Sequence, residues 1–201
     1  MDDRTGESRE ARGAGQSENV REWKRTTRRS TGARIGPRRG PLLCCGPVPT
    51  LRSTHVEVYL FRRRGRRVEF LLLRRAPGRR VLPGVWQPVT GKRHARESML
   101  AAARREVREE TGLVPRRWWA LETMTLYPDV TSDTIVALPL FAAEIAARAV
   151  VRLSGEHDAS RWVSAAEAAR RVLWESQRRG LEAVRRQVLR GGRLEAALEI
   201  G

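Results

Sequence analysis

Three carboxylates share one face of a predicted helix. Glu106, Glu109 and Glu110 occupy positions i, i+3 and i+4, so their side chains lie within a single helical turn. They precede Gly112, where we expect the helix to end, and an acidic side chain near a helix C-terminus is disfavoured by about 0.3–1 kcal/mol. A hard divalent cation reverses this balance, because Mg²⁺ binds oxygen ligands and net negative charge. The pattern therefore favours a site for Mg²⁺ or Mn²⁺.

The same residues, taken alone, are equally compatible with a solvated charged helix. In that arrangement Arg105 pairs with Glu109 four residues later, while Arg104 and Arg108 dilute the repulsion between the carboxylates. Ion pairs of this kind are common on exposed helices and need no ligand. The local spacing does not choose between a metal site and a surface helix.

A longer signature surrounds the carboxylates and is far more specific. Five residues separate Gly91 from Glu97, and seven separate Glu97 from the pair Arg105-Glu106. After the pair come apolar Val107, Arg108, Glu109-Glu110, Thr111, Gly112 and apolar Leu113. Residues 91–113 therefore match every fixed position of the Nudix box. On this match, the region from about residue 54 to residue 190 resembles a Nudix hydrolase.

A second, weaker layer of similarity lies outside the box. The stretch Trp86-Gln87-Pro88-Val89-Thr90 before Gly91 is similar to the start of the box in Nudix pyrophosphatases of the dihydroneopterin triphosphate type. Glu156-His157, ahead of Trp162, is similar to the same group. The sequence departs from the family at His94 and Arg96, where many members carry Glu and Gly. The departure bears on the shape of the substrate more than on the chemistry.

The resemblance implies a fold and a reaction. The fold is of the α/β class, the Nudix-type α/β/α sandwich around a mixed β-sheet. The reaction is attack of water on phosphorus, which cleaves a phosphoanhydride bond of a nucleoside or pterin triphosphate or of another nucleoside diphosphate derivative. Alternatives are the same chemistry on ADP-ribose, a dinucleoside polyphosphate or capped RNA. A regulator that binds nucleotides or nucleic acid without turnover is a further alternative, although a pure binder of anions gains nothing from clustered carboxylates.

The resemblance also implies which residues hold the cofactor. Glu106, Glu109 and Glu110 are the expected ligands of Mg²⁺ or Mn²⁺, with the carbonyl oxygen of Gly91 as a further ligand. Such cations neutralise the bridging oxygens of a pyrophosphate and acidify the attacking water.

Other box residues are expected to support the carboxylates. Arg105 orients Glu106, Glu97 braces the box by ion pairing, and Gly112 ends the helix. Two carboxylates compete for the part of general base: Glu110 within the box and Glu156 on a later loop, where an exposed loop acid is the competing interpretation.

Basic residues near the box are candidates for binding the substrate phosphates. Lys92, Arg93 and Arg75 would supply the balancing positive charge there. For Arg75 and Arg93 a solvated surface position is the favoured interpretation, because the chain is so rich in arginine. Trp118, Trp119 and Tyr127 lie on a predicted strand, where core or edge packing is favoured over stacking on a nucleobase.

Alternating apolar residues and turn signals predict the elements that position the site. Residues 56–60 and 68–72 alternate around Gly65, which predicts a β-hairpin. A Ser-x-x-Glu capping box at Ser164 predicts the start of a helix. The further expected elements are a helix over 97–111, strands over 118–127, 134–145 and 160–163, and a helix over 176–190 closed by two glycines.

Composition divides the chain into a tail, a domain and a short end segment. Residues 1–50 contain 11 basic and 6 acidic side chains but only five of Leu, Ile, Val or Phe, too few to form a core. We expect a disordered Arg-rich tail over 1–50, a Nudix hydrolase domain over 51–192 and a C-terminal tail over 193–201. The arginines of the first segment favour solvated charge over an arm that contacts nucleic acid.

Charge and composition also exclude several protein classes. The 201 residues include 40 Lys and Arg against 23 Asp and Glu, a net charge of +17. No apolar run reaches the roughly 18 residues of a membrane span, so we expect a cytoplasmic protein with no membrane partner. The resemblance to Nudix hydrolases implies a small-molecule nucleotide partner. Cys44 and Cys45 cannot build a disulfide framework or a four-ligand zinc site. The sequence leaves the oligomeric state open, a homodimer included.

Overall fold

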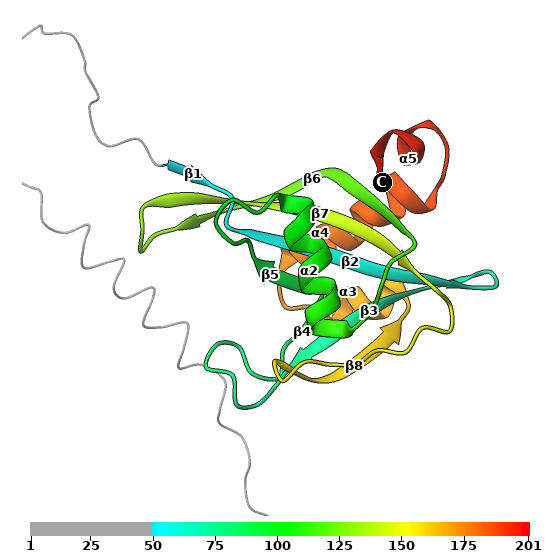
Figure 1. Cartoon of the computed structure of the whole chain (residues 1–201), viewed down its shortest axis with the longest axis horizontal. Helices are drawn as coiled ribbons and strands as arrows, with labels where there is room; N and C mark the ends of the chain where they lie inside the picture. Colours follow the sequence, from blue (N-terminus) through cyan, green and yellow to red (C-terminus); the bar gives the residue numbers. More distant parts are fainter. Residues whose placement is uncertain (1–49) are drawn as a thin grey trace, which may run out of the picture. The chain divides into compact units, whose positions relative to one another are not determined.

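One mixed β-sheet organises residues 50–201, the part of the chain that the computed structural model describes (Figure 1). Its strands are β1 (Thr50–Arg52), β2 (His55–Arg64), β3 (Arg67–Arg75), β4 (Trp86–Gln87), β5 (Val89–Lys92), β6 (Arg117–Asp129), β7 (Thr134–Ile145), β8 (His157–Val163) and β9 (Glu199–Ile200). The order is β4-β3-β2-β7-β6-β9, while β1 pairs with β7, β5 with β2 and β8 with β3. The predicted N-terminal tail and both cysteines lie outside the described residues, apart from Thr50.

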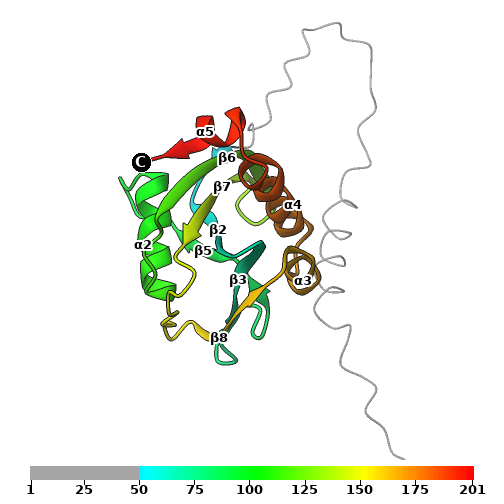
Figure 2. The same cartoon turned by 90° about the vertical axis from the view of Figure 1, so that its right-hand side faces the viewer.

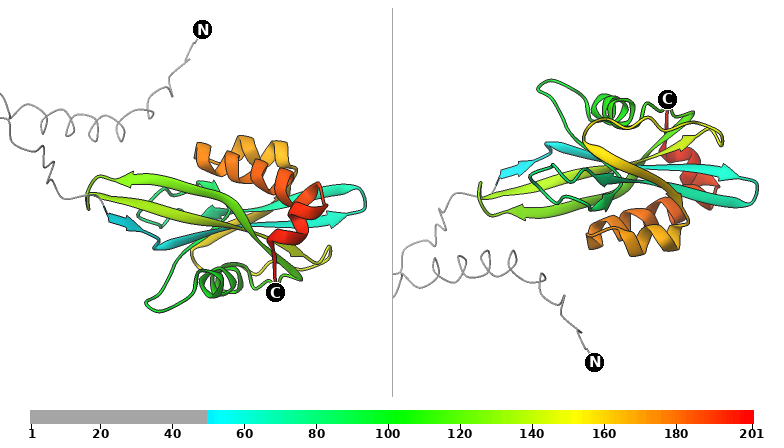
Figure 3. Two further views of the ribbon diagram at one scale, coloured as in Figure 1. Left: turned by 90° about the horizontal axis from the view of Figure 1, so that it is seen from above. Right: turned by 90° about the horizontal axis from the view of Figure 1, so that it is seen from below.

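Helices cover both faces of this sheet (Figures 2 and 3). Helix α2 (Met99–Thr111) lies on one face, and α3 (Ala165–Arg171) and α4 (Glu175–Val184) lie on the other. Each layer is filled by its own apolar cluster, one containing Val107 of α2 and the other Leu181 of α4. The predicted α/β/α sandwich around a mixed sheet is confirmed.

Strand β2 lies in the middle of the sheet and is buried on both faces. Val56 and Val58 belong to the cluster under α2, whereas Tyr59 and Phe61 belong to the cluster under α3 and α4. The strand pairs antiparallel with β3 and β5 and parallel with β7. The predicted hairpin is confirmed as β2 and β3, with Gly65 in the turn at a φ of 59°.

Helix α2 begins two residues later than the sequence predicts. The side chain of Ser98 accepts a hydrogen bond from the backbone N–H of Ala101, so Ser98 caps the helix and Glu97 precedes it. The helix ends at Gly112, as predicted, where φ is 66° and the N–H donates to the carbonyl of Arg108 at 2.8 Å. Glu97 is therefore not part of the helix, and its carboxylate faces the helix from the preceding loop.

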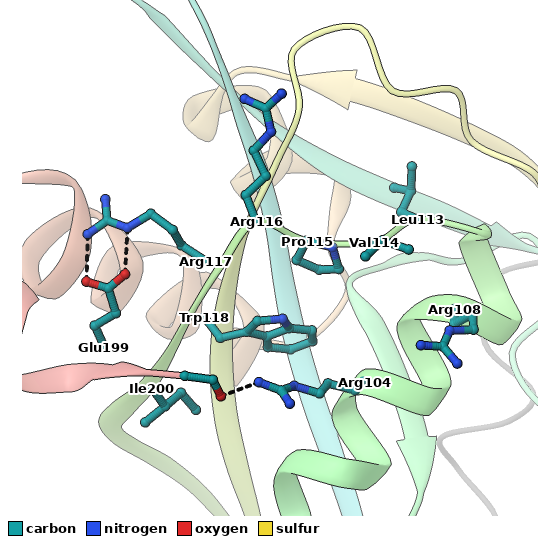
Figure 4. A pocket seen from close by; sticks show the side chains of 11 residues that line it. Arg104, Arg108, Leu113, Val114, Pro115, Arg116, Arg117, Trp118, Glu199 and Ile200 are labelled. Carbon is teal, nitrogen blue, oxygen red and sulfur yellow. Dashed lines mark hydrogen bonds and ion pairs between the residues drawn. The ribbon is translucent and has the colours of Figure 1, made fainter.

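The C-terminal segment belongs to the fold. Helix α4 continues as a π-helical turn, η1 (Arg185–Leu189), which the predicted helix over 176–190 includes. Residues 193–201, expected as a tail, instead contain α5 (Arg193–Leu198) and β9, which pairs antiparallel with β6. Arg117 of β6 donates two hydrogen bonds to Glu199 of β9, at 2.7 and 2.8 Å (Figure 4). The expectation of a tail was wrong because composition alone does not reveal that β9 pairs with the edge strand β6 and forms an ion pair with it.

The remaining predicted elements are present, and two of the strands, β6 and β8, have longer bounds than predicted. The strands expected over 118–127, 134–145 and 160–163 are β6, β7 and β8. The helix predicted at Ser164 is α3. The backbone N–H of Glu167, in its first turn, donates a hydrogen bond to the Ser164 side chain at 3.2 Å, so Ser164 caps the helix. Within residues 50–201, no helix has the length and apolar character that crossing a membrane requires.

Candidate active site

Helix α2 and strand β5 border a cavity of about 330 Å³. It collects three carboxylates, several polar groups and two basic side chains from distant parts of the chain. The lining residues are His55, Arg75, Gln87, Thr90, Gly91, Lys92, Glu106, Glu110 and Glu156. Of the predicted site residues, Glu109, Arg93, Arg105, Glu97 and Gly112 are not among them.

Gly91 lies where no side chain fits. It stands opposite Val56 in the pairing of β5 with β2, and its backbone faces the carboxyl end of the Glu106 side chain. A Cβ atom at position 91 would overlap that carboxylate. The φ of Gly91 is not positive, so close approach rather than backbone freedom requires glycine here. The carboxylate of Glu106 and the backbone of β5 are thereby held against each other.

Arg105 is the centre of a hydrogen-bond network that fixes the box. Its Nε donates to Glu97 Oε1 at 3.0 Å, and its Nη1 donates to Glu106 Oε1 at 2.8 Å and to Glu109 Oε2 at 3.0 Å. Its Nη2 donates to the carbonyl of Lys92 at 2.8 Å and to Glu97 Oε2 at 3.1 Å. One guanidinium therefore ties the loop, strand β5 and two carboxylates of α2 together.

This network has a clear effect on charge. The hydrogen bonds from Arg105, followed by one from the backbone N–H of His94, lower the pKa of Glu97 to about 2. The hydrogen bonds between Arg105 and Glu97 also raise the pKa of Arg105. The bonds from Arg105 to Glu106 and Glu109 add to this rise. Both groups are thus firmly charged, which suits the predicted bracing role of Glu97.

Glu110 differs from the other box carboxylates because it is buried. Only 5% of the residue is exposed, and its Oε2 has no hydrogen-bond partner within the described part of the chain. Burial raises the pKa of Glu110 to about 9, helped by the negative charges of Glu106, Glu156 and Glu109 and opposed by Arg75. A buried carboxyl oxygen without a partner is costly unless a ligand completes it.

The residues present fit a divalent cation by their chemistry. The cavity supplies hard oxygen atoms from Glu106, Glu110 and Glu156 and from the backbone of Gly91, which is the donor set that Mg²⁺ prefers. The Oε2 atom of Glu110 has no hydrogen-bond partner in the described residues, and a bound cation would coordinate it. Within residues 50–201, however, no three His, Cys, Asp or Glu side chains are already placed to hold one metal ion. The predicted ligand set stays a prediction.

Two of the predicted carboxylates are already engaged elsewhere. The side chain of Glu109 is 57% exposed and directed to Arg105, away from the cavity lining. Glu156 reaches the cavity from the loop before β8, but it also forms an ion pair with Arg79 at 3.2 Å. Both contacts involve exposed arginines or carboxylates and are weak enough to exchange for a stronger ligand.

The three predicted phosphate-binding residues separate into two groups. Arg75 and Lys92 line the cavity, and the Nε of Arg75 donates to the carbonyl of Val81 at 2.9 Å. Arg93 lies outside it and donates to the carbonyl of Glu97 at 3.3 Å. The structure therefore brings two of these cations to the carboxylates and leaves the third on the loop before α2.

Sequence reasoning did not assign three residues of the lining. His55 lies at the start of β2, accepts or donates at Nδ1 toward Thr54 Oγ1 at 2.9 Å, and has its pKa lowered by burial and by Lys92. Gln87 and Thr90 belong to the stretch before the box, which was noted only for its resemblance. Strand pairing reveals these positions: β2 with β5 places His55 opposite Lys92, and β3 with β4 places Gln87 opposite Leu73.

A different cavity, of about 450 Å³, lies beside α2 at its arginine-rich face (Figure 4). Arg104 and Arg108 of α2 line it together with Arg116 and Arg117, and the buried ring of Trp118 forms part of its wall. Arg104 donates to the carbonyl oxygen of Gly201. Glu199 is the one carboxylate among the lining residues, and it is paired with Arg117. This cavity has no donor set for a divalent cation.

Comparison with protein families matches a known domain. The profile described as the NUDIX domain matches residues 51–184, which is two thirds of the chain. This span contains β2 to α4 and therefore every residue that lines the 330 Å³ cavity.

One curated relative is a larger protein. The chain is 35% identical over 131 residues to an octanoyltransferase from Myxococcus xanthus, a match that covers 65% of this chain and 35% of the relative. The matched region is thus about a third of that protein, and its name describes the whole.

Three solved structures share the fold. A NUDIX hydrolase from Listeria monocytogenes is 23% identical with a TM-score of 0.60, covering 69% of this chain and 96% of the other. The NUDIX domain of NrtR from Shewanella oneidensis, solved with ADP-ribose, is 17% identical with a TM-score of 0.56, covering 69% and 87%. The dihydroneopterin triphosphate pyrophosphohydrolase of E. coli is 21% identical with a TM-score of 0.55, covering 71% and 99%. At these identities the likeness concerns the fold alone.

Proposed function

This chain belongs to the Nudix hydrolase family, and from that premise we propose that it hydrolyses a phosphoanhydride bond with Mg²⁺ or Mn²⁺ as cofactor. The proposed substrate is a nucleoside or pterin triphosphate or another nucleoside diphosphate derivative. The reaction is water attack on phosphorus, and the products are two phosphorylated fragments. We also propose a cytoplasmic location for the protein.

One observation carries the proposal. The buried, partnerless carboxyl oxygen of Glu110 lies in the same cavity as Glu106 and Glu156, next to the basic side chains of Arg75 and Lys92. Carboxylates alone repel a polyphosphate, whereas carboxylates that hold a cation next to basic side chains attract it. The combination favours metal-assisted hydrolysis over simple anion binding.

We assign roles to the chain's own residues on this basis. Glu106 and Glu110 would hold the cation, with the Gly91 carbonyl and Glu109 as further ligands once the contact of Glu109 with Arg105 is exchanged. When bound, the cation acidifies water and neutralises charge on the bridging oxygens. Arg105 keeps Glu106 in place, and Glu97 keeps Arg105 in place.

Arg75 and Lys92 complete the proposed site by binding the substrate phosphates. Both line the cavity, so they would contact the phosphates without leaving the positions that the fold gives them. Arg93 would have to release the carbonyl of Glu97 to join them.

The reaction class is tested by the release of phosphate or pyrophosphate from a nucleotide panel with and without Mg²⁺. The panel includes all common nucleoside triphosphates, dihydroneopterin triphosphate, ADP-ribose, a dinucleoside polyphosphate and capped RNA. We expect Mg²⁺-dependent release from at least one member. If no substrate releases product while RNA binding is salt-sensitive, a regulator replaces the hydrolase as the best interpretation.

The identity of the general base is tested by a separate pair of variants. Glu156 lines the cavity and is exposed enough to change partner, so we propose it as the base or as an extra metal ligand. Glu156→Gln should then lower kcat by about 10²-fold or more, as loss of a general base does. A loss within about threefold, alongside a 10²-fold loss for Glu110→Gln, assigns the base to the box instead.

A further inference from the structure

A neighbouring cavity of about 440 Å³ adjoins the proposed active site at strand β5. Gln87 and Thr90 line both cavities, so the two cavities adjoin at these residues. In the pairing of β2 with β5, Thr90 stands opposite Glu57, which places the two side chains on the same face of the sheet. The residues that line this second cavity are Glu57, Gln87, Thr90, Thr125, Leu126, Tyr127, Leu138, Trp174, Ser176 and Gln177.

The inner part of this cavity is rich in hydrogen-bond acceptors. Glu57 is 3% exposed and Gln177 is 4% exposed. The hydroxyl of Tyr59 donates to Glu57 Oε1, and Gln177 Nε2 donates to Glu57 Oε2 at 3.3 Å. Each carboxylate oxygen can accept a second hydrogen bond, and Gln177 Oε1 has no partner within residues 50–201. The buried acceptors therefore outnumber the donors available to them.

The charge of Glu57 is also incompletely compensated. Within the described residues, no Lys, Arg or His forms an ion pair with it. Burial raises the pKa of Glu57, while the hydrogen bonds from Tyr59 and Gln177 oppose the rise. A ligand that donates further hydrogen bonds would stabilise the charged carboxylate in the same way.

The mouth of the cavity is apolar and aromatic. Tyr127 is 42% exposed, Leu126 is 61% exposed and Trp174 is 52% exposed. Exposed aromatic side chains beside a buried polar floor provide a surface on which a flat ring can stack. The sequence favoured core packing for the three aromatic residues of β6, and that holds for Trp118 and Trp119, whereas Tyr127 is free to contact a ligand.

We propose that this cavity binds the heterocyclic ring of the substrate and selects rings with two adjacent N–H donors, the 2-amino-4-oxopyrimidine edge that guanine and pterin share. A carboxylate accepts the ring N–H and the amino N–H of this edge together. Adenine and cytosine place a ring acceptor beside their amino group, and uracil flanks its single N–H with carbonyls, so each presents an acceptor to Glu57. The inference rests on the proposed function, because the phosphates then lie in the adjoining cavity.

The test measures ring binding without metal and without turnover. Calorimetry with the full chain compares guanosine monophosphate and neopterin with adenosine and uridine monophosphates. We expect at least one of the first two probes to bind tenfold or more tightly than the last two, since a bidentate pair discriminates by about five- to 150-fold. Whichever of guanosine monophosphate and neopterin binds more tightly identifies the source of the ring.

Three variants connect the preference to the acceptors. Glu57→Gln presents an amide donor and should reduce the preference to below threefold. Gln177→Leu removes the acceptor that has no partner and should weaken binding of the preferred probe. This variant provides the test if Glu57→Gln fails to fold. Arg108→Gln is the control, because Arg108 lines the separate cavity beside α2 and not this one, so the preference should stay tenfold or more.

The outcomes separate this inference from the proposed function. Equal affinity for all four probes, or an unchanged preference in folded Glu57→Gln and Gln177→Leu, overturns the ring site even if Mg²⁺-dependent hydrolysis is observed. A clear preference with no hydrolysis of any substrate overturns the proposed hydrolase and supports the ring site on its own.

Discussion

The two charged faces of helix α2 border different cavities, and they differ most in burial. On one face Glu110 is 5% exposed with a partnerless oxygen, beside a cavity of about 330 Å³. On the other face Arg104 and Arg108 are exposed beside a larger cavity of about 450 Å³. An exposed guanidinium keeps its water, whereas a buried carboxylate without a counterion is unstable until a ligand joins it. Burial, rather than cavity size or number of charges, is therefore the property that distinguishes the acidic face as the proposed site.

The largest expected contrast between the faces is in turnover. Glu106→Gln and Glu110→Gln should each lower kcat by about 10²-fold or more, because each removes a proposed metal ligand or base. Arg108→Gln, on the opposite face, should stay within about twofold. Steady-state rates on the best substrate of the panel provide the measurement. Comparable losses on both faces would show that burial is a poor guide to function here.

The response to metal should separate the faces next. Mg²⁺ at about 100 times its dissociation constant should stabilise the wild type by about 2.7 kcal/mol. Glu109→Gln with Glu110→Gln should abolish the shift in Tm and leave the metal-free protein as stable or more so, since repulsion and an unfavourable dipole contact disappear. Arg104→Gln with Arg108→Gln is the control and should keep the shift. A double Gln variant that is unfolded without metal would contradict the explanation.

Close packing sharpens the comparison at a single position. Gly91→Ala would push a Cβ into the carboxylate of Glu106, and forced overpacking of this kind typically lowers stability by about 1–3 kcal/mol. Gly78→Ala meets no atom within 4 Å and should change stability by less than about 0.5 kcal/mol. Chemical denaturation of both variants gives the free energies of unfolding. Equal stabilities would mean that Glu106 moves aside without cost.

The last contrast is the dependence of stability on pH without metal. The pKa of Glu110 is about 9 in the folded protein and 4.5 ordinarily, so the folded state holds the extra proton between these values. The contribution of protonated Glu110 to the free energy of unfolding is complete below pH 4.5. It is lost as pH rises toward 9, by at most about 1.4 kcal/mol per pH unit. Glu110→Gln should flatten this decline in denaturation curves measured from pH 6 to 9. An unchanged slope would place the titrating group elsewhere.

The box and most of the fold were predictable from the sequence because their signals are local. The spacing from Gly91 to Leu113 identified the family, and alternation around Gly65 identified the hairpin. Helix caps at Ser164 and Gly112 follow from residue type. Each of these features depends on neighbours within a few positions, which a linear pattern records.

What the sequence could not supply depends on contacts between distant segments. The burial of Glu110 and the orphaning of its oxygen require β5, α2 and the loop at Glu156 to meet. Likewise Glu57 and Gln177 lie 120 positions apart and gave no motif. The C-terminal strand β9 was missed because two residues are too short to show alternation.

The parallel pairing of β2 with β7 has a consequence for how the molecule is made. Glu57 stands beside Leu140 in that ladder, so the strand on which β5 rests acquires its second neighbour only after a long stretch of polypeptide has emerged from the ribosome. Parallel pairing between segments distant in the sequence forms late in folding, because the entropy cost of closing the loop precedes the favourable contacts of the paired strands. A nascent chain that already contains the complete Nudix box therefore still lacks β7, the parallel partner of β2 in the finished sheet.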